Sequence, residues 1–151
     1  MKNIKKNIPL TENSNKLFGY ANLFSEFETL YNNENLPKIL IFTGEKGTGK
    51  FSFIFHFINF ILSKKTISPY NKENFTIQTD NEVFKKIKLN IEQNFNYLGC
   101  EKPNEISVDN VRELKLKLSK IPFNNFPRFT VIDDVELINA SSANALLKLI
   151  E

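Results

Sequence analysis

A glycine-rich segment that ends in lysine is the clearest chemical signal in the sequence. Gly44-Glu45-Lys46-Gly47-Thr48-Gly49-Lys50 matches the first seven positions of the nucleotide-binding P-loop pattern. Glycines let such a backbone take positive φ angles and turn its N–H groups towards a phosphate, while the lysine adds a cation. We therefore assign these seven residues to a predicted ATP site. A glycine-rich turn that happens to include a lysine is the alternative, and Lys46 fits a solvated loop lysine equally well.

The eighth position of the pattern departs from it. The pattern has Ser or Thr there, whose hydroxyl binds Mg²⁺, and this chain has Phe51. A phenyl ring cannot coordinate magnesium, and Ser52 is rotated by about 100° around the predicted helix. The phosphate cradle is built from backbone, so it survives the change. We therefore predict that Phe51 lines the nucleotide site, with ATP possible as ligand and magnesium binding in doubt.

Two carboxylates follow an apolar run of β-formers at residues 129–132. In P-loop proteins the first acid at such a place orders the Mg²⁺ shell, and in AAA+ ATPases the next residue is usually Glu, which orients the attacking water. Asp133 is therefore a candidate magnesium ligand and Asp134 a weak catalytic candidate. Asp134 is shorter than Glu by about 1.5 Å, and a misplacement of about 1 Å can cost two orders of magnitude in rate. Capping of the strand or of the next turn is the alternative.

The elements that must position these residues alternate between strand and helix. Residues 38–43 predict a buried strand before the glycine-rich turn, and the apolar residues after it predict a helix over 50–63. Residues 64–81 read as a surface insertion. Further strands are predicted at 96–99 and 129–132, and further helices at 17–31, 82–93, 107–119 and 141–150, with Ser107 or Asp109 capping the third of these and Ser141 or Ser142 the last. This order predicts an α/β fold with a parallel sheet and crossover helices.

Composition excludes several classes. The 151 residues are 41% hydrophobic and 25% charged, which is typical of a globular domain. The net charge of +3 does not by itself indicate nucleic-acid binding, and the single cysteine excludes an internal disulfide and a cysteine-built zinc site. No apolar stretch is long enough to span a bilayer, so we predict a soluble cytoplasmic protein. His56, the only histidine, lies in an apolar segment and is predicted to be packed rather than catalytic.

Several segments resemble the clamp-loader subunits of bacterial DNA polymerase III, which are AAA+ P-loop ATPases. The resemblance runs from about residue 9 to residue 151 and is carried by the acidic strand end and by two flanking segments. Near the start, Leu17-Phe18-Gly19-Tyr20 is similar to the segment that lies against the adenine, which implies that Tyr20 lines the nucleotide site. The most specific strings are Ile106-Ser107-Val108-Asp109-Asn110-Val111-Arg112-Glu113-Leu114 and Ala143-Asn144-Ala145-Leu146-Leu147-Lys148-Leu149-Ile150-Glu151.

Within this family the chain resembles the delta-prime kind of subunit. The gamma/tau motor usually has an intact Gly-Lys-Ser/Thr, an Asp-Glu pair and a four-cysteine zinc module, and this sequence has none of them. The resemblance implies an N-terminal arm at 1–16 and a partial AAA+ domain at 17–151, truncated before the sensor strand, lid and collar domain. It also implies a DNA polymerase III holoenzyme component with weak or absent ATPase activity, which helps to place a sliding clamp on primed DNA with the gamma/tau and delta subunits. The alternatives are an active AAA+ ATPase, such as the gamma/tau motor, and a nucleotide-free structural remnant.

Overall fold

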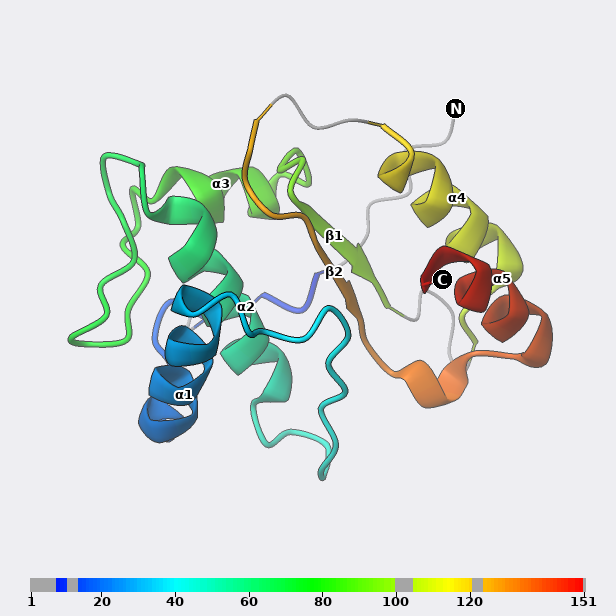
Figure 1. The fold of residues 1–151 in the computed structure, drawn as a ribbon, viewed down its shortest axis with the longest axis horizontal. Coiled ribbons are helices and arrows are strands. Elements are labelled where there is room, and N and C mark those ends of the chain that lie inside the picture. Colours follow the sequence, from blue (N-terminus) through cyan, green and yellow to red (C-terminus); the bar gives the residue numbers. More distant parts are fainter. Residues whose placement is uncertain (1–7, 11–13, 100–104, 121–123, 151) are drawn as a thin grey trace. The chain divides into compact units, whose positions relative to one another are not determined.

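The computed structural model describes residues 8–10, 14–99, 105–120 and 124–150. The chain divides into two compact units, which are described separately. We call residues 10–85 the loop unit, because it contains the glycine-rich segment. Residues 1–9 together with 86–151 form the sheet unit. The described residues form five α-helices, one 3₁₀ helix and two strands (Figure 1).

Two helices build most of the loop unit. Helix α2 spans Lys50–Ser63, as the sequence predicts, and it begins directly after Gly49. Because α2 is apolar on nearly all sides, most of its residues are buried. Helix α1 spans Ala21–Asn32 and begins four residues later than predicted. The delay has a local cause, since Gly19 has a φ of 77° and Tyr20 is the non-helical residue that precedes the helix.

Aromatic rings fill the core of the loop unit. Phe24 of α1 is fully buried and lies at the centre of this core. Edge-to-face and offset ring pairs of this kind add about 0.5–1.5 kcal/mol each beyond their buried area. The rings whose centroids lie within 6.3 Å of the Phe24 centroid belong to Phe53, Phe57, Phe60, Tyr70 and Phe75.

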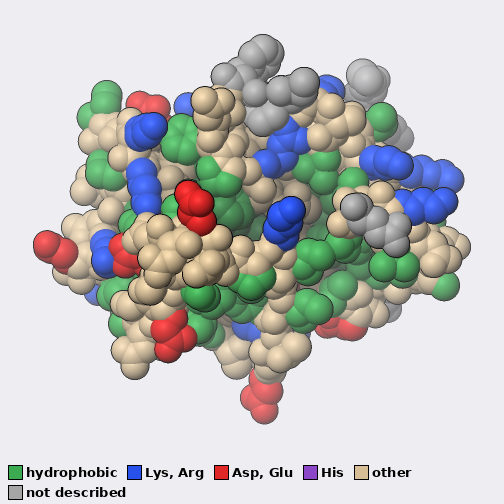
Figure 2. Space-filling view, in the orientation of Figure 1, with side chains coloured by type: hydrophobic (Ala, Val, Ile, Leu, Met, Phe, Trp, Pro, Cys, Tyr) green, Lys and Arg blue, Asp and Glu red, His purple; other side chains and the backbone are tan. Residues whose placement is uncertain are grey.

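The predicted strand at residues 38–43 is wrong. The segment has no regular secondary structure, and the side chains of Ile39, Leu40 and Ile41 are 56%, 40% and 80% exposed. Hydrophobic side chains also reach the surface elsewhere (Figure 2). A strand forms only when a neighbouring strand satisfies its N–H and C=O groups. No described segment pairs with residues 38–43, so their β-forming composition is not sufficient.

Residues 64–81 were predicted to be a surface insertion, and this too is wrong in part. The segment contains no helix or strand, but Tyr70, Ile77 and Asn81 are buried. Helix α3, at Glu82–Lys88, follows it and is shorter than the predicted 82–93. The helix ends early because Asn90 has a φ of 59° and donates its N–H to the carbonyl oxygen of Ile87 at 2.9 Å.

A parallel pair of strands defines the sheet unit. Strand β1 spans Phe95–Leu98 and strand β2 spans Phe129–Ile132, with Phe95 opposite Phe129 and Leu98 opposite Ile132. Both predicted strands are therefore confirmed to within a residue. Helix α4 lies between them in sequence, as expected for a parallel connection (Figure 1).

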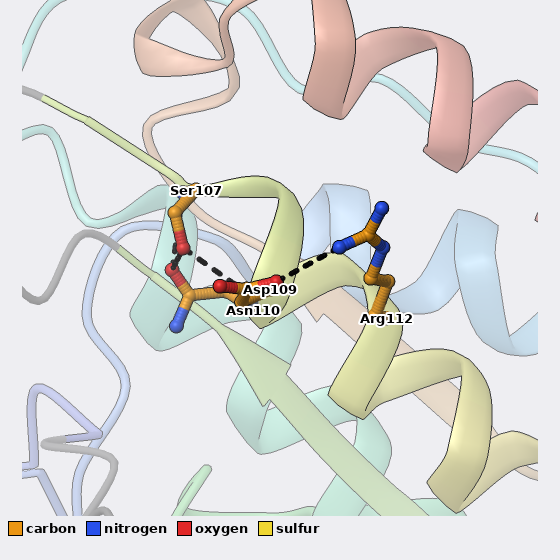
Figure 3. Close-up of polar contacts among 4 residues, drawn as sticks. All are labelled: Ser107, Asp109, Asn110 and Arg112. Atoms are coloured by element: carbon orange, nitrogen blue, oxygen red, sulfur yellow. Dashed lines mark hydrogen bonds and ion pairs between the residues drawn. The ribbon is translucent and has the colours of Figure 1, made fainter.

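Helix α4 spans Val108–Leu118, and its first turn shows why it begins there. Ser107 and Asn110 form a reciprocal capping box, in which the Ser107 oxygen accepts the Asn110 N–H and the Asn110 side chain accepts the Ser107 N–H (Figure 3). Of the two predicted caps, Ser107 is the correct one. Arg112 pairs with Asp109 at 3.1 Å on the exposed side of the helix.

The last described helix, α5, spans Ala140–Ile150 and follows a 3₁₀ turn, η1, at Val135–Leu137. The predicted caps Ser141 and Ser142 are wrong, because the Asn139 side chain accepts the Ser142 N–H at 2.8 Å. Ser142 is instead buried and donates its hydroxyl to the Ile106 carbonyl. Helices α4 and α5 pack on the sheet through an aliphatic core of Leu98, Ile106, Val111, Leu114 and Leu146.

None of the helices in the described part of the chain combines the length and the apolar character that crossing a membrane requires.

Candidate functional site

The glycine-rich loop of the loop unit has a backbone that suits its glycines. Gly44, Gly47 and Gly49 have φ angles of 139°, 85° and 87°, which other residues rarely adopt. Gly49 is also crowded, because a Cβ atom there would lie 3.3 Å from Cε2 of Tyr20. Both restrictions favour glycine at the residue that directly precedes α2.

The side chain of Lys50 folds back over its own loop. Its ammonium donates to the carbonyl oxygens of Gly44 at 2.8 Å and Glu45 at 2.7 Å, and the Thr48 hydroxyl donates to the Glu45 carbonyl at 2.9 Å. The positive charge of Lys50 therefore lies over the first residues of the loop. These bonds also fix the direction of two peptide groups at the start of the loop.

The backbone donors of the loop are available to a ligand. Residues 46 and 47 form a hydrogen-bonded turn, and among the described residues the N–H groups of residues 45–47, 49 and 50 donate to no backbone carbonyl. Consecutive free N–H groups that precede a helix N-terminus are the donors with which proteins hold phosphate oxygens. The loop thus fits a phosphate on two independent features, its backbone donors and the Lys50 ammonium.

Tyr20 lies against the same loop. Its hydroxyl donates to the carbonyl oxygen of Thr48 at 2.5 Å, and its ring packs on Phe53 with the centroids 5.4 Å apart. The contact that the structure gives Tyr20 is therefore to the loop backbone. The predicted contact with adenine stays a prediction.

Phe51 follows Lys50 in the first turn of α2. Its ring is half-buried and stacks on that of Phe55, with the centroids 6.1 Å apart and 13° between the ring planes. An aromatic stack supplies no ligand for Mg²⁺. The residues at this end of the loop fit a phosphate and do not fit a magnesium ion held from the helix.

The predicted acidic pair belongs to the sheet unit, and its polar contacts are made within that unit. Asp133 continues the ladder by donating its N–H to the Leu98 carbonyl, and its carboxylate accepts from the Tyr97 hydroxyl and the Asp134 N–H, each at 3.1 Å. Asp134 has a φ of 50° and precedes η1. Asp133 therefore caps the end of the strand. In the described ranges no three His, Cys, Asp or Glu residues gather as a metal site would require.

Tyr97 is the partner of Asp133 that the sequence interpretation missed. It lies one residue before the end of β1, and β1 pairs with the strand that ends at Asp133. The sequence shows only a tyrosine near the end of a predicted strand. Its contact with Asp133 can be predicted only when the pairing of the two strands is known.

His56 is a packed core residue, as predicted. It is fully buried in α2; its Nε2 donates to the Ser14 carbonyl at 3.2 Å, and its Nδ1 accepts from the Tyr70 hydroxyl at 3.0 Å. Because the Ser14 carbonyl can only accept, Nε2 carries a proton, and in the neutral ring Nδ1 is then the acceptor. Burial lowers the pKa of His56 from 6.5 to about 4, and burial also raises the pKa of Tyr70 above its usual value.

Comparison with known proteins adds the family. Residues 19–151 match the family model described as DNA polymerase III, delta subunit. No curated protein matches the chain. Because the match covers far more than half of the sequence, the chain belongs to the DNA polymerase III delta subunit family, a clamp-loader-type family of the replication machinery.

Proposed function

We propose that this chain is a delta-prime-like clamp-loader subunit whose glycine-rich loop binds the phosphates of ATP without efficient hydrolysis. Membership of the family supports partnership with other DNA polymerase III clamp-loader subunits. Within that complex we assign it the gamma/tau and delta subunits as partners. It reaches the sliding clamp and primed DNA through the complex, in the cytoplasm.

The observation that carries the ATP part of the proposal is the contrast between Lys50 and Phe51. Lys50 keeps its ammonium at the loop, and the N–H groups of residues 45–47, 49 and 50 add backbone donors. These groups would hold the β- and γ-phosphates. In P-loop enzymes Mg²⁺ neutralises the charge that develops on the transferred phosphate. The residue that would hold the ion from α2 is Phe51, whose ring stacks on Phe55.

The acidic pair, Asp133 and Asp134, also supports a loop that binds ATP but does not hydrolyse it efficiently. Asp134 stands where an active AAA+ ATPase has Glu, and its side chain is one methylene shorter. It also has a left-handed backbone, with φ 50° and ψ 48°. We infer that the loop holds nucleotide as a fixed structural element, so that the subunit serves as a rigid partner for the subunits that hydrolyse ATP.

Binding of a fluorescent ATP analogue tests the proposal. Replacing Lys50 by Ala removes a charge-assisted contact, and we expect the affinity for the analogue to fall by about 10- to 100-fold. Lys38→Ala is the matched control, because Lys38 is an exposed lysine of the same unit that precedes the loop. Equal affinities for Lys50→Ala and the unchanged chain would refute binding through the loop.

A nucleotide-free structural role is the second candidate, and one observation favours it. Residues 38–43, which lead into the loop, form no strand, and the Lys50 ammonium is already satisfied by loop carbonyls. If the folded chain binds no ATP analogue, this second role replaces the first. Steady, magnesium-dependent ATP turnover would instead favour an active AAA+ ATPase of the gamma/tau kind.

A further inference from the structure

We propose that Tyr20 is a positioning residue for the glycine-rich loop, whose hydroxyl fixes the peptide between Thr48 and Gly49 and thereby aims the Gly49 N–H at a bound phosphate. This rests on the proposed function, in which the loop binds ATP through its phosphates.

The Tyr20 side chain is itself held in place. Its ring packs on that of Phe53, which is only 1% exposed, and its backbone carbonyl accepts the N–H of Phe24 at the start of α1. The hydroxyl then reaches the Thr48 carbonyl at 2.5 Å. The first turn of α1 and the aromatic core therefore fix one atom of the loop.

Because the peptide group is planar, the hydrogen bond from Tyr20 to the Thr48 carbonyl also sets the direction of the Gly49 N–H. In a trans peptide the C=O and the following N–H point in opposite directions. A Thr48 carbonyl held by Tyr20 therefore directs the Gly49 N–H away from the tyrosine. Lys50 orients the carbonyls of Gly44 and Glu45 in the same way at the start of the loop. One side chain thus holds each end of the loop.

The proximity of the ring to Gly49 fits this role. Gly49 has a left-handed conformation, with φ 87° and ψ 15°, and a Cβ atom there would lie 3.3 Å from the Tyr20 ring. The absence of a side chain at Gly49 allows the hydroxyl to approach the preceding carbonyl. Gly49 and Tyr20 therefore act as a pair.

Tyr20→Phe separates this role from stacking on adenine, since it keeps the ring and removes only the hydroxyl. We expect the variant to bind a fluorescent ATP analogue about five- to tenfold more weakly, as for a lost hydrogen bond. Inorganic tripolyphosphate, used as a competitor, should weaken by the same factor, because it has no adenine. Tyr31→Phe is the matched control, a half-buried tyrosine of the same unit whose ring packs on Phe57, and it should stay within twofold.

A second measurement is independent of nucleotide. In NMR spectra of the unliganded chain, Tyr20→Phe should shift the carbonyl ¹³C resonance of Thr48 and the amide resonance of Gly49, whereas Tyr31→Phe should leave both in place. Unshifted resonances would overturn the Tyr20 contact, and unchanged affinities for both probes would overturn its positioning role. If the unchanged chain binds no ATP, the proposed function fails, and the positioning of phosphate fails with it. The Thr48 resonance still reports whether the hydroxyl holds the loop.

Discussion

The loop unit and the sheet unit are built from different cores. The loop unit packs rings around Phe24 and buries the neutral imidazole of His56, and its described residues contain no named strand. The sheet unit packs aliphatic side chains such as Leu98 and Leu114 between two helices and a parallel pair of strands. A histidine that protonates in acid is therefore buried in the core of the loop unit, whereas the described core of the sheet unit is aliphatic.

The two units also differ in what their polar residues do. In the loop unit the N–H groups of residues 45–47, 49 and 50 donate to no backbone carbonyl among the described residues, and the Lys50 ammonium rests on carbonyls of its own loop. In the sheet unit the Asp133 carboxylate is engaged by Tyr97 and by the Asp134 N–H. The loop unit thus carries the groups that we propose bind phosphate, while the Asp133 carboxylate, which was expected to support hydrolysis, makes structural contacts.

The largest expected effect is on the stability of the sheet unit. Leu114 is fully buried, and Leu114→Ala should lower the free energy of unfolding by about 3–4 kcal/mol through lost contacts and a residual cavity. Denaturant titration measures the change. Leu116→Ala on the same helix is the control, because Leu116 is 67% exposed, and it should change the free energy by less than about 0.5 kcal/mol. Equal losses for the two variants would contradict the assigned core.

Acid should destabilise the loop unit through His56. The folded-state pKa is about 4 and the ordinary value is 6.5, so between these pH values the unfolded chain binds a proton that the folded chain excludes. Stability therefore falls as the pH falls from 6.5 to about 4, by about 3 kcal/mol in total. Chemical unfolding at several pH values measures the slope.

His56→Gln provides the comparison for the acid experiment. Glutamine has a side-chain N–H donor but does not titrate, so the fall in stability between pH 6.5 and 4 should be reduced in this variant by the contribution of the histidine. If the slopes of the two proteins are the same, His56 is not the group responsible.

Placing a hydroxyl at position 51, next to Lys50, should make the binding of ATP depend on Mg²⁺. In Phe51→Thr we expect Mg²⁺ to tighten binding of ATP by about tenfold, or about 1.4 kcal/mol, whereas in the unchanged chain it should have little effect. Phe51→Val has nearly the same shape as threonine without the hydroxyl and controls for the lost stack on Phe55. A magnesium effect of the same size in both variants would count against Phe51 as the missing ligand.

The smallest effect is expected at the acidic strand end. Asp133→Asn keeps an oxygen that can accept from Tyr97, and we expect the affinity for ATP to change by less than about twofold. Isothermal titration measures it. A loss comparable with that of Lys50→Ala would show that the acid takes part in binding.

Much of the fold follows from local sequence patterns. Helix α2 and strand β2 lie where they are predicted, because a mainly apolar segment after a glycine-rich turn and a short run of β-formers each have clear limits. Ser107 likewise shows its role as a cap through its spacing from Asn110. The glycine positions with positive φ were predictable for the same reason, since the pattern is local.

The rest depends on partners that are distant in sequence. Residues 38–43 have the composition of a strand, but a strand needs a neighbour, and local composition does not reveal whether one is present. Tyr20 and Thr48 are 28 residues apart, so their bond follows from how α1 packs on α2. Asn139 displaced the predicted serine caps because several residues with capping side chains lie within four positions.

The central claim is that the loop binds ATP without a magnesium requirement. The most direct test is isothermal titration of the whole chain with ATP, in excess Mg²⁺ and in excess chelator, with ATP turnover followed in the same samples. The account predicts affinities within about threefold of each other in the two conditions and no steady turnover. Binding that needs Mg²⁺ and is accompanied by sustained hydrolysis would contradict it.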